Sequence, residues 1–318
     1  MPGRLMPENN LRIRDISTRE IAGNASSSGL DLNYGAATVR VRSALHGFAH
    51  VVHWVYGAFH LRPPDAEFAE YHIQLRRGRG IRSVLRRQSR FLIDGVEPFE
   101  PFAAEGVLPL FEWGVNWCFA NRANQYVLLH SGALALDDRA VIMAAPPGSG
   151  KSTLAAAMML RGFRLLSDEF GVLRPETGDL LPMLKPVALK NQSVEVIRSF
   201  SEDAVIGPLF TGTRKGDVAH LAPNDLSVDA VGCPARPALV LFPRFESGAD
   251  LDARLLPGEE AFAHLAFNSF NYHLLGPVGF EAVARVIESC PAYQVRYSQL
   301  DHAIEWIRAR LREMEPAA

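Results

Sequence analysis

The hydrophobic pattern of the chain changes character about two fifths of the way along. Before that point, apolar and polar residues alternate with a period of two at 38–42, which predicts a half-buried strand. Further strands are predicted at the apolar stretches 50–60, 71–75 and 91–93. Leu110, Trp113 and Trp117 recur at helical spacing and predict a helix over about 108–120. This part of the chain is therefore expected to be β-rich.

Beyond that point, strands and helices follow one another. An apolar run at 140–144 predicts a buried strand, and Leu154, Ala157 and Met158 give the segment 151–160 one apolar helical face. The remaining predicted elements are strands at 126–129, 164–167 and 238–242, a hairpin over 170–183 and a last helix after Asp301. The centre of this part is thus a strand–loop–helix–strand unit.

These patterns divide the chain into three regions. Residues 1–14 are polar and of mixed charge, and we expect them to be loose. Residues 15–122 form an N-terminal α+β region, in which Ser17 and Glu20 fit a capping box and predict a short first helix. Residues 123–318 form a second region, which carries the motifs described next.

A phosphate-binding loop is predicted between the strand and the helix of the central unit. Its sequence at 145–153 is Ala-Pro-Pro-Gly-Ser-Gly-Lys-Ser-Thr, a Walker A pattern with Ala in place of the usual first Gly. Such a turn points backbone N–H groups at phosphate oxygens, and the helix N-terminus adds partial positive charge. The residues predicted to hold ATP or GTP are Gly148, Ser149, Gly150, Lys151, Ser152 and Thr153. An ordinary Gly/Pro turn is the alternative, which the position of Gly-Lys-Ser-Thr disfavours.

Two adjacent acids, Asp168 and Glu169, follow the loop after only one helix and one strand. Carboxylates beside a phosphate site are usually functional. One acid would accept the proton of an attacking hydroxyl, and the other would help to hold Mg²⁺ together with the Ser152 hydroxyl. The predicted metal ligands are therefore Ser152, Asp168 and Glu169, with a solvated turn as the alternative interpretation of the acids.

Three further residues are candidates for the same site. His130 ends the apolar strand at 126–129 and is interpreted either as a structural residue or as a catalytic one. The chain has only four lysines, and we hypothesise that Lys190 and Lys215 contact phosphate or the acceptor. Ordinary surface positions are the alternative for both lysines.

The chain resembles HprK-related kinase A, a group similar to the kinases that tailor lasso peptides. The motifs that carry the resemblance are 112–117, 130–132, 145–153, 161–164, 167–169, 184–186, 189–191, 215–220 and 242–244. It covers nearly the full chain, whereas the resemblance to HPr kinase/phosphorylase itself covers only about 127–175.

The resemblance implies an α/β fold with a mixed sheet and a phosphate loop between strand and helix, in a core similar to phosphoenolpyruvate carboxykinase. It also implies a Mg²⁺-dependent kinase that phosphorylates serine, with Asp168 as base, His130 beside it and Glu169 on the metal side. The family has Asp at the second acidic position, so Glu169 departs from its pattern. No counterpart of the C-terminal signature of HPr kinase is found, and its hexamer, its phosphorolysis and HPr as substrate are not carried over.

The composition of the chain limits the classes of partner that we expect it to bind. The formal net charge of −2 at pH 7 gives no bulk attraction to nucleic acid, although seven arginines cluster within 76–90. The three cysteines are scattered, without the spacing of a zinc or disulfide framework. The segment 1–14 lacks an apolar signal core, and the longest apolar run, 48–61, is too short to span a membrane. We therefore expect a cytoplasmic protein without nucleic-acid or membrane partners, and the sequence leaves homo-oligomerisation open.

Three functions are weighed. The leading one is a kinase that phosphorylates a hydroxyl of a peptide or protein. A small-molecule kinase is disfavoured because a hairpin, rather than helices and an Arg-rich lid, follows Glu169. An NTPase switch or scaffold in a peptide-modification pathway is disfavoured by the lack of an Asn-Lys-x-Asp motif. The acceptor, the preferred base, phosphorolysis and the role of the N-terminal region stay open.

Overall fold

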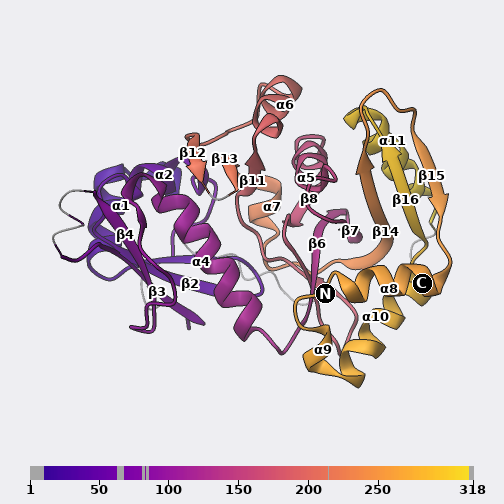
Figure 1. Ribbon diagram of the computed structural model, residues 1–318, viewed down its shortest axis with the longest axis horizontal. Helices are drawn as coiled ribbons and strands as arrows, with labels where there is room; N and C mark the ends of the chain where they lie inside the picture. Colours follow the sequence, from indigo (N-terminus) through magenta and orange to yellow (C-terminus); the bar gives the residue numbers. More distant parts are fainter. Residues whose placement is uncertain (1–10, 63–67, 81–82, 84–85, 214, 315–318) are drawn as a thin grey trace. The chain divides into compact units, whose positions relative to one another are not determined.

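The computed structural model of the protein describes residues 11–62, 68–80, 83, 86–213 and 215–314. The chain forms two compact units, unit 1 (Met1–Asn116) and unit 2 (Trp117–Ala318), whose boundary falls within helix α4 (Val107–Arg122) (Figure 1). The expected loose segment 1–14 lies, for residues 1–10, outside the described residues. The backbone N–H groups of Ile13 and Arg14 donate to Phe59 O and Gly57 O, both at 2.9 Å.

Unit 1 is built on a sheet of order β1-β2-β3-β4-β5, in which β2 and β3 run parallel and the other neighbours antiparallel. Its strands are β1 (Leu30–Asn33), β2 (Thr38–Ser43), β3 (Tyr71–Arg77), β4 (Gln88–Ile93) and β5 (Phe102–Ala103). Among its described residues, the helices with stated bounds are η1 (Ile13–Asp15), α1 (Thr18–Ser26), α2 (Phe48–Val55), η2 (Ala104–Gly106) and the first part of α4. The predicted capping box of α1, the strands at 38–42, 71–75 and 91–93 and the helix over 108–120 are confirmed.

The strand predicted near 50–60 is wrong, because this stretch begins with helix α2. Phe48, Val52 and Val55 are buried, whereas Trp54 is half-exposed. Positions i, i+4 and i+7 thus form one apolar helical face. A short run rich in apolar residues fits both a helix and a strand, so periodicity alone does not separate them.

Unit 2 contains the larger mixed sheet, of order β10-β9-β6-β7-β14-β16-β15 with β8 also paired to β6, and a small antiparallel sheet of order β11-β13-β12. Its strands are β6 (Val127–Leu136), β7 (Arg139–Ala144), β8 (Arg164–Ser167), β9 (Phe170–Leu173), β10 (Leu180–Leu181), β11 (Val187–Lys190), β12 (Phe210–Thr213), β13 (Gly216–Leu221), β14 (Arg236–Phe245), β15 (Asp252–Leu255) and β16 (Ala292–Tyr297). Its helices, besides the end of α4, are α5 (Lys151–Leu160), α6 (Gln192–Phe200), α7 (Asp225–Asp229), α8 (Gly258–Phe267), α9 (Tyr272–Leu275), α10 (Pro277–Ser289) and α11 (Leu300–Glu313). These elements confirm the predicted α/β class with a mixed sheet.

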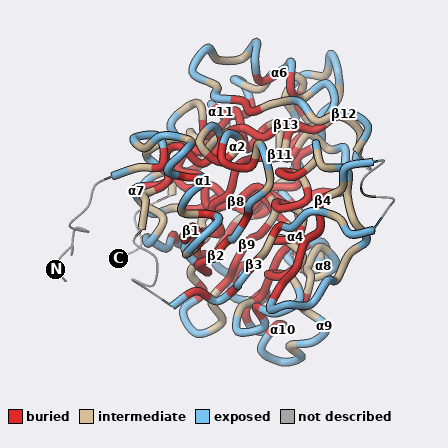
Figure 2. Tube along the Cα trace, turned by 90° about the vertical axis from the view of Figure 1, so that its left-hand side faces the viewer, coloured by how far each residue is buried: buried red, intermediate tan, exposed pale blue. Residues whose placement is uncertain are grey.

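The core of unit 2 lies between the sheet and its helices. Buried residues of β6, β7 and β14 pack with those of α8 and α10, including Val240, Leu265 and Val283. Helix α5 contacts β6, β8, β11, α6 and α11. Figure 2 shows β8 and β9 among the buried segments of the trace. None of the described helices combines the length and apolarity that a membrane-crossing segment requires.

Strand directions bring the two sequence motifs to one edge of this sheet. Strand β6 runs antiparallel to both β7 and β8, so β7 and β8 point the same way. The phosphate loop follows the end of β7, and the two acids follow the end of β8. The intervening strand β6 presents its segment 130–132 there, with Ser131 opposite Ala144 and Ala133 opposite Ser167.

Candidate functional site

The loop after β7 has the backbone conformation that a phosphate cradle requires. Gly148 and Gly150 adopt left-handed φ angles of 88° and 89°, which glycine reaches without steric cost. Gly150 is also the N-cap of α5, so Lys151 and Ser152 lie in the first turn of that helix. The first-turn N–H groups of a helix have no partner within the helix and carry its positive partial charge. The loop can therefore hold an anion.

The ammonium group of Lys151 is buried and makes no hydrogen bond to the described residues. The residue is only 9% exposed, and its Nζ atom has no hydrogen-bond partner among the described residues. Burial lowers the pKa of Lys151, an effect opposed by the charges of Glu169 and Asp168 and reinforced by that of Lys190. A buried, unpaired cation is costly, and a phosphate oxygen would satisfy it.

Gly132 of β6 lies between the lysine and the acids. A Cβ atom on this residue would lie 3.8 Å from Lys151 Cγ, 3.8 Å from Asp168 O and 3.3 Å from Met143 Cε. The phosphate-loop lysine and the first acid therefore border the same small residue, on the same side of β6.

Asp168 is a buried carboxyl group whose pKa is shifted towards neutrality. It is 5% exposed, and burial followed by the negative charge of Glu169 raises its pKa to about 6. The positive charges of Lys185 and Lys151 oppose this rise, as does the backbone N–H of Ala188, which donates to Asp168 Oδ2 at 3.2 Å. A carboxyl group with this pKa can take up and release a proton near neutral pH.

Glu169 is held in the charged form. Burial alone would raise its pKa, but His130, through a hydrogen bond and its charge, followed by Lys151 and Lys215, lowers it to about 2. His130 Nε2 lies 3.4 Å from Glu169 Oε1. The histidine that the family resemblance placed beside Asp168 thus pairs with the neighbouring acid. When the pKa values of two adjacent carboxyl groups differ this much, one group can exchange a proton near neutral pH while the other stays ionised, a pattern typical of acid–base sites.

Two lysines from segments that follow Asp168 and Glu169 in the chain lie near the site. Lys190 ends β11 and Lys215 lies in the turn before β13, close enough for their charges to act on Lys151 and Glu169 respectively. The turn is braced by Asn191, whose side-chain Oδ1 accepts from Asp217 N at 3.1 Å.

Sequence reasoning missed Lys185 as a site residue. It is buried, and its charge lowers the pKa of Asp168. The signal that could have found it is the scarcity of lysine, since the chain has only four.

The oxygen donors fit a hard cation. Mg²⁺ is usually held by one or two carboxylates together with substrate phosphates and water. Ser152, Asp168 and Glu169 supply donors of that kind, and the low pKa keeps Glu169 ionised. The described residues contain no group of three or more His, Cys, Asp or Glu side chains placed to hold a metal ion by themselves.

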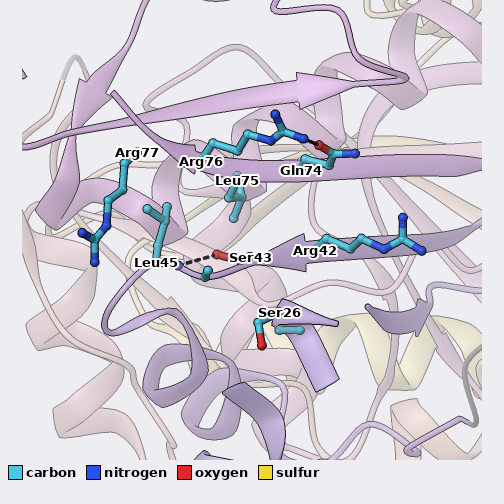
Figure 3. A pocket seen from close by; sticks show the side chains of 10 residues that line it. Ser26, Arg42, Ser43, Leu45, Gln74, Leu75, Arg76 and Arg77 are labelled. Carbon is cyan, nitrogen blue, oxygen red and sulfur yellow. Dashed lines mark hydrogen bonds between the residues drawn. The ribbon is translucent and has the colours of Figure 1, made fainter. Parts of the chain in front are cut away.

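The arginine cluster of the sequence belongs to unit 1 and divides into separate environments. Arg90 is buried and pairs with Glu97 at 2.8 Å. Arg76 and Arg77 end β3 and line a cavity of about 490 Å³ together with Arg42 of β2. Figure 3 shows Arg76 directed toward Gln74, whereas Arg77 extends toward Leu45. Arg82 lies outside the described residues.

No protein-family model and no curated protein matches the chain. Among solved structures, the chain is similar to the Hpr(Ser) kinase/phosphatase from Coxiella burnetii, with 16% identity and a TM-score of 0.29. The match covers 59% of this chain and 99% of that one. A similarity this weak does not indicate a function.

Proposed function

We propose that the protein is a Mg²⁺-dependent kinase that transfers the γ-phosphoryl group of ATP or GTP to a hydroxyl group, a serine of a peptide or protein. The observation that carries the proposal is the buried Lys151 ammonium, which lacks a hydrogen-bond partner among the described residues and lies at the N-terminus of α5. A cation in this position favours a bound anion. The two carboxyl groups near it can serve as a proton acceptor and as a metal ligand, and a simple anion site needs neither.

In the proposed step, the acceptor oxygen attacks the γ-phosphorus while the bond from that phosphorus to the β–γ bridging oxygen breaks. The acceptor proton passes to the Asp168 carboxylate, and the nucleoside diphosphate leaves. The pKa of about 6 lets Asp168 be unprotonated at neutral pH and still basic enough to receive this proton. Lys151 neutralises charge that develops on the transferred group.

The neighbouring residues have supporting roles in this proposal. Glu169, kept ionised by His130, supplies with Ser152 the oxygen ligands for Mg²⁺, which would offset the phosphate charge when bound. His130 is then a positioning residue for Glu169. Lys190 and Lys215 are candidates for contacts with phosphate or with the acceptor, because their charges reach Lys151 and Glu169.

The experiment is a transfer assay. The protein is incubated with γ-labelled ATP or GTP, Mg²⁺ and serine-containing peptides, and label on peptide and free phosphate are both counted. We expect labelled peptide that disappears with Asp168→Asn. Free phosphate alone would support an NTPase switch instead, and label on a small hydroxylated metabolite but not on peptide would support a small-molecule kinase. Absence of any nucleotide binding would overturn the proposal.

A further inference from the structure

The sheet edge that carries the phosphate loop continues on the side away from the acids. Strand β14 pairs in parallel with both β7 and β16, so the carboxyl ends of these three strands lie at one edge. In open α/β sheets, ligands bind outside the carboxyl ends of the strands. On one side of β7 lie β6 and β8 with the acids, and on the other side β14 and β16 end at Phe245 and Tyr297.

These two aromatic residues contact the phosphate loop directly. Phe245 N donates to Ser149 O at 2.9 Å, and the Tyr297 hydroxyl donates to Gly150 O at 3.4 Å. Their rings meet edge to face, with centroids 5.9 Å apart. Tyr297 is buried, whereas Phe245 is 49% exposed. A half-exposed aromatic side chain therefore lies beside the loop.

A cavity of about 280 Å³ adjoins Tyr297, the buried member of this pair. It lies between the loop 248–251 and the segment 297–299, with Tyr297 and Gln299 in its wall. This volume is slightly below the usual range of ligand pockets, about 300–1,000 Å³, and so suits part of a nucleotide rather than the whole. The exposed amide of Gln299 can both donate and accept hydrogen bonds.

The walls of the cavity are joined by hydrogen bonds. Glu246 N donates to Tyr297 O at 2.9 Å, which links the ends of the two strands. The Ser298 hydroxyl donates to Ala249 O at 2.7 Å across the loop, and Ala249 N donates to Glu246 O at 3.1 Å. The cavity is thus a preformed feature of the fold.

We propose that this cavity, with the half-exposed ring of Phe245, receives the nucleoside end of the nucleotide. The inference rests on the proposed function. The transferred phosphoryl group must lie near Lys151 and Asp168, on the β6–β8 side of the loop. The rest of the nucleotide then extends over the loop towards β14 and β16, where the base stacks on Phe245 and its edge meets Gln299.

The test separates the two ends of the nucleotide. Binding of ATP, GTP and inorganic tripolyphosphate, each with Mg²⁺, is measured by calorimetry for the wild type and for Phe245→Ala, Gln299→Trp and Phe280→Ala. Phe280→Ala is the matched control, since Phe280 is 54% exposed but lies on α10. Gln299 makes no side-chain cap to α11, so its replacement removes no helix cap. Thermal melting of each variant verifies that it folds.

We expect Phe245→Ala to weaken binding of the preferred nucleotide about 5- to 150-fold, the range for loss of one base–aromatic stack. Gln299→Trp should weaken it in the same direction, because the indole occupies the cavity. Tripolyphosphate binding should be unchanged in both variants, and all binding unchanged in Phe280→Ala.

Two results would overturn the inference while leaving the kinase proposal intact. One is wild-type affinity for both nucleotides no greater than for tripolyphosphate. The other is equal weakening of nucleotide and tripolyphosphate in Phe245→Ala, which would show that Phe245 acts only by supporting the loop. A wild type that binds none of the three probes would instead overturn the proposed function, and this inference with it.

Discussion

Buried charged residues of unit 1 and Lys151 of unit 2 differ in whether the described residues satisfy them. In unit 1, Asp31 and Arg40 are buried together and form two hydrogen bonds of 2.7 Å, and the buried Tyr56 hydroxyl donates to the buried carboxylate of Glu112. In unit 2, Lys151 is buried to a similar extent, yet its ammonium has no hydrogen-bond partner among the described residues. Satisfied buried charges stabilise a fold at best modestly, whereas an unsatisfied one costs stability and is retained where a ligand completes it. The comparison thus singles out Lys151 as a candidate functional group.

Asp31 and Asp168 can be compared directly, because they are buried to the same extent, with exposed fractions of 6% and 5%. One faces a guanidinium that is buried with it. The other lies beside a second carboxylate, and its pKa is raised to about 6. The same substitution at the two positions should therefore act on different properties of the protein.

The largest expected effect is on phosphoryl transfer. Asp168→Asn removes the proposed base, and the rate of transfer should fall by roughly 10²–10⁴ while nucleotide affinity is retained. Single-turnover transfer rates and calorimetric dissociation constants measure the two quantities. Full transfer by this variant would show that another group accepts the proton.

Asp31→Asn should act on stability. It removes the negative charge that Asp31 places against the buried Arg40 guanidinium, and unfolding of unit 1 should become easier by about 3–5 kcal/mol, the usual cost of breaking a buried ion pair. Urea unfolding followed by hydrogen exchange at unit 1 amides measures the change. Transfer activity per folded molecule serves as the control. A loss below about 1 kcal/mol would contradict a structural role for the pair.

Asp168→Asn should stabilise the protein, whereas Asp31→Asn destabilises it, and the size of the stabilisation should depend on pH. The folded pKa of Asp168 is raised from 3.8 to about 6, so the folded state loses stability as pH rises through this interval. Asn cannot ionise, so the variant should gain about 1–3 kcal/mol relative to the wild type, growing from pH 4 to 6 and constant above. Denaturant unfolding at pH 4 and pH 7 measures the difference. Equal differences at both pH values would refute the raised pKa.

The smallest expected effect concerns the arginine-lined cavity of unit 1. Arg76 and Arg77 are exposed, and their single replacement by Ala should change stability by no more than about 0.5 kcal/mol. Unfolding curves at low and high salt measure this change. A larger loss would mean that these side chains are part of the packing of unit 1. A raised KM for an acidic acceptor peptide would instead mark the cavity as a binding surface.

The sequence predicted a local element correctly where a sequence motif and the spacing of apolar residues indicated the same element. The helix over 151–160 is observed with those bounds, because the phosphate loop fixes its start and Gly162 its end. The strand prediction at 50–60 failed because a short run rich in apolar residues fits both a helix and a strand. The resemblance to HprK-related kinases stays a prediction, since no family model matches the chain.

Within the site, the sequence named the phosphate loop, the acids and two lysines, but it could not assign their environments. It placed His130 beside Asp168, and only the coordinates show its contact with Glu169. Lys185 lies in one of the motifs that carry the family resemblance, and the scarcity of lysine could have selected it. Phe245 and Tyr297 come from segments that carry no local motif for phosphate or base, so the pattern gave no reason to select them.

The amino-acid sequence by itself determined which residues are predicted to cradle phosphate, because that chemistry needs a contiguous glycine-rich loop ahead of a helix. The tertiary structure alone decided that one buried acid has a pKa of about 6 and its neighbour one of about 2. Such shifts come from burial and from charges brought together by strand pairing, and neither is a property of neighbouring positions in a chain.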